Sequence, residues 1–283
     1  MTPSAADLVA RQPRLGTLPA VYYQLLDVIR QPSSTAGAIS EVILTDPGLS
    51  ARLLKLVNSA FYGFPRRIET VSRAVTLVGT RQLCDLALAT SVIRVFEDIP
   101  QNLLTLDSFW KHSLATGICA RVIAENGLDV DSERLFVAGL LHDVGRLVLC
   151  LSEPEKMARA LELSRQREEL LHQTEKEMFG FTHADVGACL LDQWGLPVSL
   201  VEAVRWHHRP SAADEHQELT AVVHLADVIV NSLRIGSSGA AFVPPVWTRA
   251  WQIAEVELTD IDGLIEQTRR ILGDVQPVFL AAA

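Results

Sequence analysis

An apolar stretch near the middle of the chain constrains its fold most. Residues 135–151 read Leu-Phe-Val-Ala-Gly-Leu-Leu-His-Asp-Val-Gly-Arg-Leu-Val-Leu-Cys-Leu, so the only ionisable side chains other than the cysteine are His142, Asp143 and Arg146. A run this apolar predicts a buried helix. Because an unpaired buried charge costs several kcal/mol, each of the three groups needs a partner. A divalent metal would satisfy His142 and Asp143 together, whereas a His–Asp pair that satisfies itself is the simpler alternative. These residues alone favour the simpler one.

The rest of the chain predicts an all-α protein. Apolar residues recur with a period near 3.6 through most of the 283 residues, and we find no convincing alternating strand. We expect a loosely ordered start over 1–14, an N-terminal helical lobe over about 15–100, and a second lobe over about 101–272. The boundary at 97–102 is too short for a free linker, which favours two lobes of one unit. Residues 273–283 are expected to form a C-terminal tail.

Several local signals place individual helices within this plan. Asp46 followed by Pro47 predicts a helix start, with Asp46 as N-cap and Pro47 in the first turn. Thr182 and Asp185 resemble a capping box. Residues 157–171 form an amphipathic, charged segment that predicts a surface helix, and the last helix is expected over about 260–272. The Gly/Ser/Pro-containing segment 236–245 predicts a flexible loop.

Composition narrows the class of function. The net charge is −9 and no basic stripe is visible, which argues against nucleic-acid binding. No apolar run is expected to serve as a membrane helix of roughly 20 residues, and the N-terminus has no secretory signal, so we expect no membrane insertion and a cytoplasmic location. None of the four cysteines lies in a CxxC pair, and all fall in apolar segments, which indicates core thiols in a reducing compartment. They are Cys84, Cys119, Cys150 and Cys189.

Polar groups in apolar or helix-terminal settings recur beyond the central stretch. Ligands of a metal in a helical bundle come from facing helices, so side chains far apart in the sequence can share one site. Asp143 is the natural bridge if two ions are held. One isolated histidine would favour an ordinary core or surface role, but five such histidines in a chain with eight shift the balance towards a metal site. The candidate ligands are His112, His142, Asp143, His183, His207, His208 and Asp227. His224, one turn before Asp227, is a candidate to support a ligand from outside the site.

The order of these residues resembles the HD superfamily of metal-dependent phosphohydrolases, and the whole pattern resembles its HDOD domain over roughly residues 15–272. The resemblance also rests on motifs without histidine. In the N-terminal half these are Leu18-Pro19, Asp46-Pro47-x-Leu49, Leu54-x-x-x-Asn58-Ser59-Ala60-x-Tyr62 and Ala74-x-x-Leu77-x-Gly79. In the C-terminal half they are Gly187-Ala188-x-Leu190-x-x-x-Trp194-x-Leu196-Pro197 and His207-His208. The resemblance implies an all-α fold, with an HD-type helical bundle and an N-terminal helical lobe, a bacterial origin and a signalling context.

The resemblance leaves two functions open. The related HD-GYP proteins hydrolyse cyclic di-GMP and carry a Gly-Tyr-Pro signature soon after their His-His pair, where this chain has Arg209-Pro210-Ser211-Ala212. They also usually have Lys where Arg146 stands, and Arg146 is the candidate phosphate contact. HDOD domains are regarded as interaction modules without demonstrated hydrolase activity.

We therefore expect a cytoplasmic regulatory module that binds other signalling proteins without catalysis, with or without one or two divalent ions. The alternative is a metal-dependent phosphodiesterase or phosphohydrolase acting on a linear or cyclic nucleotide, and a cyclic nucleotide is also the ligand that the resemblance suggests. Because imidazole dominates the ligand set, iron, zinc, manganese or nickel would fit better than calcium. The sequence does not determine the oligomeric state.

Overall fold

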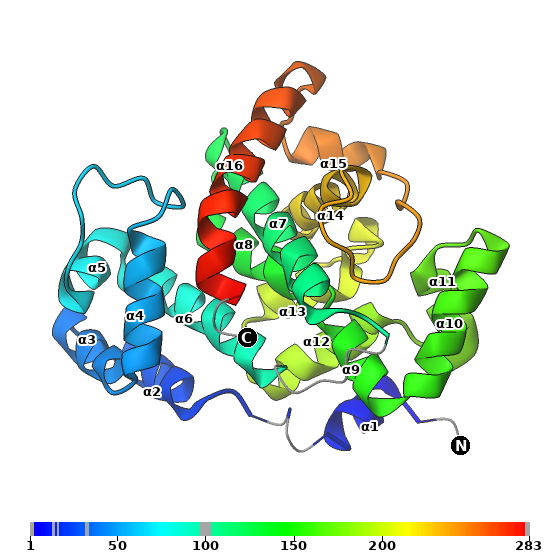
Figure 1. Cartoon of the computed structure of the whole chain (residues 1–283), viewed down its shortest axis with the longest axis horizontal. Coiled ribbons are helices and arrows are strands. Elements are labelled where there is room, and N and C mark those ends of the chain that lie inside the picture. The colour runs from blue at the N-terminus through cyan, green and yellow to red at the C-terminus, as the bar shows by residue number, and fades with distance from the viewer. Residues whose placement is uncertain (1–2, 13–14, 16, 32–33, 97–102, 281–283) are drawn as a thin grey trace. The chain divides into compact units, whose positions relative to one another are not determined.

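The computed structural model describes residues 3–12, 15, 17–31, 34–96 and 103–280, and within these ranges every regular element is a helix. The all-α prediction is thus confirmed (Figure 1). The helices are α1 Ala5–Ala10, α2 Ala20–Ile29, α3 Ala36–Leu44, α4 Pro47–Val57, α5 Val71–Val78, α6 Thr80–Val95, α7 Leu106–Glu125, α8 Ser132–Leu141, α9 Val144–Ser152, α10 Pro154–Arg167, α11 Leu171–Phe179, α12 His183–Gln193, α13 Val198–Trp206, α14 Gln217–Ser232, α15 Thr248–Ile253 and α16 Ile261–Leu280, with short 3-10 turns at Pro210–Ala212 and Leu258–Asp260.

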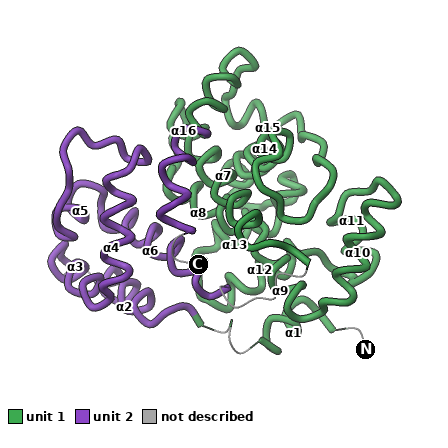
Figure 2. Tube along the Cα trace, viewed as in Figure 1, with its two compact units in different colours: residues 1–17, 98–268 green, residues 18–97, 269–283 purple. Residues whose placement is uncertain are grey.

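The chain divides into two compact units, each made of two segments (Figure 2). Unit 1 comprises residues 1–17 and 98–268, and unit 2 comprises residues 18–97 and 269–283. The sequence-based boundary at 97–102 lies outside the described residues, and the division into lobes of one unit stays a prediction.

Unit 2 is built from α2 to α6 and the end of α16. Asp46 caps α4 by accepting a hydrogen bond from the Leu49 N–H at 2.9 Å, as its position before Pro47 predicts. Asn58 at the end of α4 has a structural role. Its amide donates to the Ile68 carbonyl at 2.8 Å and accepts from the Ile68 N–H at 2.7 Å, which closes the loop between α4 and α5. The Asn58-Ser59-Ala60 motif is therefore explained at least partly by loop closure.

Unit 1 holds the apolar centre of the sequence. Helices α7 and α8 pack closely, and a Cβ built on Gly139 would lie only 2.6 Å from the Gly117 Cα. Helix α14 packs against both, and α12 packs against α9 and α13. Glycine also allows the close approach of α9 to α12. A Cβ on Gly145 would lie 2.0 Å from the His183 carbonyl oxygen, so only glycine lets the two helices approach this far.

The N-terminus differs from expectation. Residues 1–14 were predicted to be loosely ordered, but α1 forms within them and packs against α9 and α12. Ser4 and Asp7 form a capping box, and Leu8 and Val9 are buried. A helix of six residues is marginal alone, so its burial in unit 1 stabilises it.

Three further helix predictions need correction. The stretch 135–151 is not one helix, because α8 ends at Leu141 and α9 begins at Val144. The last helix does not end near Leu272 but continues to Leu280 through Pro277, and its apolar face continues with the buried Val275 and Phe279. No separate helix is predicted at 171–179, where the structure has α11.

The statement on membrane helices also needs correction. The stretch Ser132–Ser152, which contains α8 and α9, is by length and composition long and apolar enough to cross a membrane. In the fold 89% of its apolar window is buried, as in the core of a soluble protein. Burial within the protein thus explains the hydropathy.

Candidate metal centre

The interruption between α8 and α9 creates the centre of the site. His142 follows α8 and Asp143 precedes α9, and both side chains are buried. The backbone of Asp143 has φ −102° and ψ 3°, which departs from the helix and turns its carboxylate away from the helical ladder. The two adjacent side chains therefore reach the same site from the short connection between α8 and α9.

The first group of candidate ligands surrounds one oxygen of Asp143. The His142 Nε2 lies 3.2 Å from Asp143 Oδ2 and 3.3 Å from Asp227 Oδ1. The His112 Nε2 lies 3.2 Å from Asp227 Oδ1 and 3.7 Å from Asp143 Oδ2. Helices α7 and α14 thus supply one ligand each beside the α8–α9 junction.

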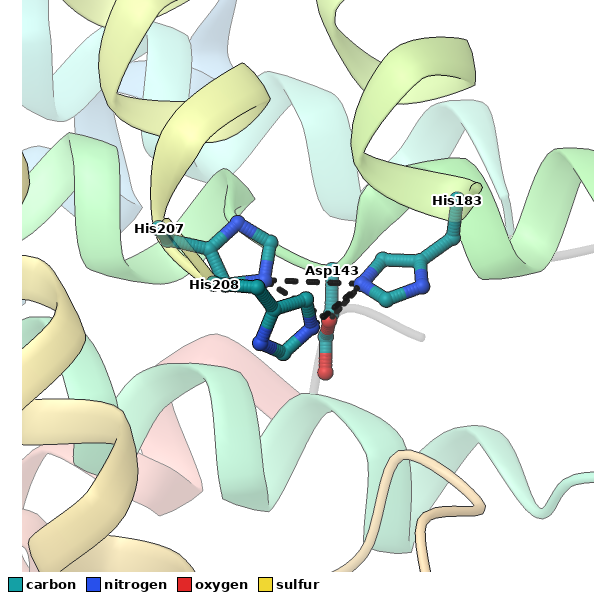
Figure 3. A group of neighbouring side chains, drawn as sticks. All are labelled: Asp143, His183, His207 and His208. Carbon is teal, nitrogen blue, oxygen red and sulfur yellow. Dashed lines mark hydrogen bonds and ion pairs between the residues drawn. The ribbon is translucent and has the colours of Figure 1, made fainter. Parts of the chain in front are cut away.

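The second group surrounds the other oxygen of Asp143. The His183 Nε2 lies 2.9 Å from Asp143 Oδ1, and the His207 Nε2 lies 3.7 Å from the same oxygen. The His208 Nε2 lies 3.2 Å from the His183 Nε2. Figure 3 shows the three rings gathered about the Asp143 carboxylate. The structure therefore brings together all seven predicted residues, with Asp143 between two groups, while their role as ligands stays a prediction.

Three of the histidine rings are held so that Nε2 faces the centre with a lone pair. The Nδ1 of His142 lies 2.6 Å from the Gly139 carbonyl, and that of His207 lies 2.7 Å from the Val204 carbonyl. The Nδ1 of His183 lies 2.6 Å from Glu175 Oε2. An oxygen that only accepts requires the proton on Nδ1, so the neutral ring presents an unprotonated Nε2. This is the arrangement of metal-binding histidines.

Buried polar atoms at the centre lack hydrogen bonds among the described residues. They are the Nε2 atoms of His112 and His142 and the Oδ1 of Asp143. The Nε2 atoms of His183 and His207 are 3.4 Å apart, although two unprotonated nitrogens gain nothing from facing each other. Leaving such groups unsatisfied in a dry interior is costly. A divalent cation would satisfy them together, so the donor set fits a metal.

The pKa shifts in the metal-free site also fit a place for a cation. Burial disfavours ionisation of Asp143, but Arg146, His142 and His183 outweigh it and hold the carboxyl pKa well below its usual value. Burial lowers the pKa of His142, whereas Asp143 and Asp227 raise it, and the net result is about 10. Burial, and then the neighbouring His142 and His183 rings, lower the pKa of His207. In the metal-free protein His142 therefore carries a proton between two carboxylates, and a bound cation would displace it.

Two residues that support the centre escaped the sequence analysis. Glu175 is fully buried on α11, where it binds the His183 ring and accepts from the His183 N–H at 2.8 Å. Ser238 is buried in the loop after α14 and accepts a hydrogen bond from Arg146 Nη1. Because Glu175 lies in a charged segment and Ser238 in a Gly/Ser segment, both resemble solvated residues in the sequence. The predicted flexible loop 236–245 thus places a buried hydroxyl beside the site.

Arg146 occupies a different place from the one expected of a phosphate contact. Its Nη1 lies 2.5 Å from Asp143 Oδ2, and its Nε lies 3.7 Å from Glu175 Oε1. The side chain is buried, so its guanidinium compensates two buried carboxylates. A role in holding phosphate stays a prediction, and any such contact would compete with Asp143.

Of the three histidines that are not candidate ligands, two contact a candidate ligand and one does not. The Nδ1 of His224 lies 2.7 Å from the His207 carbonyl, and its Nε2 accepts from the Trp247 N–H at 3.0 Å, so it contacts the backbone of a candidate ligand. His172, which is not among the predicted ligands, stacks on the His208 ring with centroids 4.1 Å apart. His216 lies at the start of α14, away from these contacts.

Comparison with known proteins establishes the family. The HDOD domain matches residues 15–210. The chain belongs to the HDOD domain family. This HDOD protein is 30% identical over 237 residues to an uncharacterised protein of Treponema pallidum (strain Nichols), a match that covers 82% of this chain and 45% of the relative. The chain thus spans about half the length of that relative.

Solved structures show the same fold. An HDOD protein of unknown function from Geobacter sulfurreducens superposes with a TM-score of 0.78 at 24% identity, covering 93% of both chains. A candidate phosphohydrolase from Shewanella amazonensis SB2B gives 0.75 at 26% identity over 100% of both chains. A candidate signal transduction protein from Marinobacter aquaeolei VT8 gives 0.71 at 20% identity, covering 94% of this chain and 59% of the other. Similar folds therefore occur in proteins assigned to catalysis and to signalling.

Proposed function

We propose that this HDOD protein is a metal-dependent phosphohydrolase with a two-ion centre. The observation that carries the proposal is the convergence of seven candidate ligands, six of them buried and His208 half-buried, with the Nε2 atoms of His142, His183 and His207 turned towards the centre. His112, His142, Asp143 and Asp227 would hold one ion. Asp143, His183, His207 and His208 would hold the other. The candidate phosphohydrolase from Shewanella amazonensis SB2B, which shares the fold at 26% identity, supports the assignment.

Divalent ions in such a centre would supply a nucleophilic hydroxide at neutral pH and neutralise the charge that develops on phosphorus oxygens. Neighbouring residues orient the candidate ligands and set their charge. Glu175 fixes the tautomer and orientation of His183, and His224 fixes the backbone at His207. Arg146 keeps the Asp143 carboxylate ionised and oriented. The burial of the cluster limits its contact with bulk water, which strengthens every interaction there.

One observation favours a second candidate function, the partner binding that the sequence analysis preferred. Unit 2 contributes none of the seven candidate ligands, yet it carries a cavity of about 1050 Å³. Its lining includes Lys55, Asn58, Arg67 and Asp274. A polar, hollowed surface outside the metal centre suits contact with another signalling protein in a bacterial pathway. We also propose a cytoplasmic location, which four free cysteine thiols support.

Metal analysis and turnover together test the proposal. Protein purified without chelator is analysed by plasma emission, and the metal-loaded form is incubated with p-nitrophenyl phosphate, nucleoside phosphates, cyclic di-GMP and its linear dinucleotide. We expect close to two ions per chain and turnover of at least one ester. His142→Ala should lose the ion shared with His112 and Asp227 and lose turnover, whereas His216→Ala, the matched control outside the site, should keep both ions and turnover.

Two results would contradict the proposal. The first is absence of bound metal after loading with iron, zinc, manganese or nickel. The second is a metal-loaded protein that turns over none of these esters. If such an inactive protein binds a partner that His142→Ala still binds, the second candidate function replaces the first.

A further inference from the structure

A cavity of about 420 Å³ opens beside the second group of candidate ligands. It lies at the ends of α11, α12 and α13, and His208 and His172 form part of its wall. His208 belongs to both places, since its Nε2 lies 3.2 Å from the His183 Nε2. This volume falls in the range of roughly 300–1,000 Å³ that small-molecule sites occupy. One wall of the cavity is therefore formed by a candidate metal ligand.

Three cationic side chains line this cavity, although the chain as a whole carries a net charge of −9. Lys176 is exposed on α11, Arg205 is half-buried on α13, and Arg209 is exposed just after it. None of the three has an ion pair with another described residue. The Arg209 guanidinium lies over the Trp206 ring, 4.9 Å from its centroid, which holds the charge at the cavity.

The single carboxylate in the lining is already engaged. Asp185 Oδ2 accepts from the Thr182 N–H at 2.9 Å and from the Thr182 hydroxyl at 3.2 Å, in the capping box of α12. With histidines counted as neutral, three cations and this one carboxylate leave the cavity with an excess of two positive charges. An ordinary solvated surface of an acidic chain would not gather this charge around a cavity that ends at a candidate metal ligand.

We infer that this cavity is the substrate entrance and that its charge selects a phosphomonoester, such as a nucleoside monophosphate, over a phosphodiester. The inference rests on the proposed function for the chemistry at the centre. A phosphomonoester carries about −1.5 to −2 charges at pH 7, whereas a diester carries one. The dianion matches the excess charge at the entrance, and Arg205 and Arg209 can each hold phosphate oxygens through two N–H donors.

Charge removal tests this reading. The variants are Arg205→Gln, Arg209→Gln, their double variant, and Arg165→Gln as a matched control on the exposed face of α10. Metal content is measured for each, so that a damaged centre is recognised. Adenosine 5′-monophosphate binding to the metal-loaded protein is measured by calorimetry. We expect Kd to rise about tenfold for each arginine removed, because loss of one charged hydrogen bond is worth about this factor, and to be unchanged in Arg165→Gln.

Kinetics supply the test of selectivity. The double variant should lose at least about tenfold more kcat/KM for p-nitrophenyl phosphate than for bis(p-nitrophenyl) phosphate. Nucleotide binding that is absent in the natural protein, or unchanged in the double variant, would overturn the inference. Equal losses for the two esters would overturn the selection of monoesters. If no ester is turned over but nucleotide binding weakens as described, the entrance stands and the proposed catalytic function fails.

Discussion

The substitution Gly145→Ala should disturb the metal centre without touching any candidate ligand. The new Cβ would lie 2.0 Å from the His183 carbonyl oxygen and 2.5 Å from the Gly187 N–H nitrogen. Both are backbone atoms, so no side-chain rotation relieves the overlap. Ordinary contact begins near 3.4 Å, and α9 and α12 must therefore separate by roughly 1.4 Å.

That separation acts directly on the site, because α9 begins just after Asp143 and α12 begins with His183. The two side chains are 2.9 Å apart, and ligand distances in metal sites vary by only about ±0.2 Å. We expect a loss of about 1–3 kcal/mol of unfolding free energy, the usual cost of overpacking. We also expect loss of the ion held by His183, His207 and His208, while the ion at His112 and Asp227 is kept.

Urea denaturation and metal content measure the two effects. Gly263→Ala is the matched control, since a Cβ there meets nothing within 4 Å and the residue lies within a helix. That variant should gain about 0.5–1 kcal/mol and keep its metal. If Gly145→Ala unfolds within about 0.5 kcal/mol of the natural protein and retains both ions, the account of helix approach given above is wrong.

Three further outcomes are expected. In the chelated protein Asp143→Ala should destabilise by about 3–5 kcal/mol, because Arg146 would be left buried without its main partner, and Asp143→Ala/Arg146→Met should recover part of this; urea curves that show less than about 1 kcal/mol would refute the pairing. Burial raises the pKa of the Cys84, Cys119 and Cys150 thiols to about 12, so at pH 8 a thiol reagent should modify the half-buried Cys189 first; mass spectrometry that finds Cys119 labelled equally fast in folded protein would contradict this. The Ser4 backbone and hydroxyl lower the pKa of Asp7, so its cap is fully present above the ordinary value of 3.8 and is lost as pH falls through the lowered one; hydrogen exchange of α1 should accelerate in that acid range, and Asp7→Asn should remove the pH dependence.

The sequence predicted the centre better than its surroundings, for a physical reason. A histidine or aspartate in an apolar helix, such as His112 or Asp227, is costly unless satisfied, so its position alone indicates a partner. Glu175 and Ser238 give no such signal, because their neighbours in the sequence are polar and only the tertiary fold buries them. The interruption at His142–Asp143 was missed for a related reason. The apolar pattern continues across it and gives no sign of the break between α8 and α9.

Tertiary packing decides the structure at both ends of the chain. The start was predicted to be loosely ordered, and α1 is too short to be stable on propensity alone, but its burial in unit 1 stabilises it. At the other end the last helix was expected to stop near Leu272, but it continues past Gly273 and through Pro277. The buried Val275 and Phe279 stabilise the continuing helix against both residues.

The alternation of segments between the two units bears on how the chain folds as it is synthesised. Unit 2 begins at residue 18 but includes residues 269–283, and helix α16 begins in the segment of unit 1 and ends in that of unit 2. The ribosome therefore releases residues 18–97 of unit 2 early, yet its last helical segment emerges only after all of residues 98–268. In unit 1, α1 is synthesised first but can pack only after α9 and α12 have been synthesised. Neither unit can be completed by a simple truncation, and native pairing across such sequence distances is intrinsically slow.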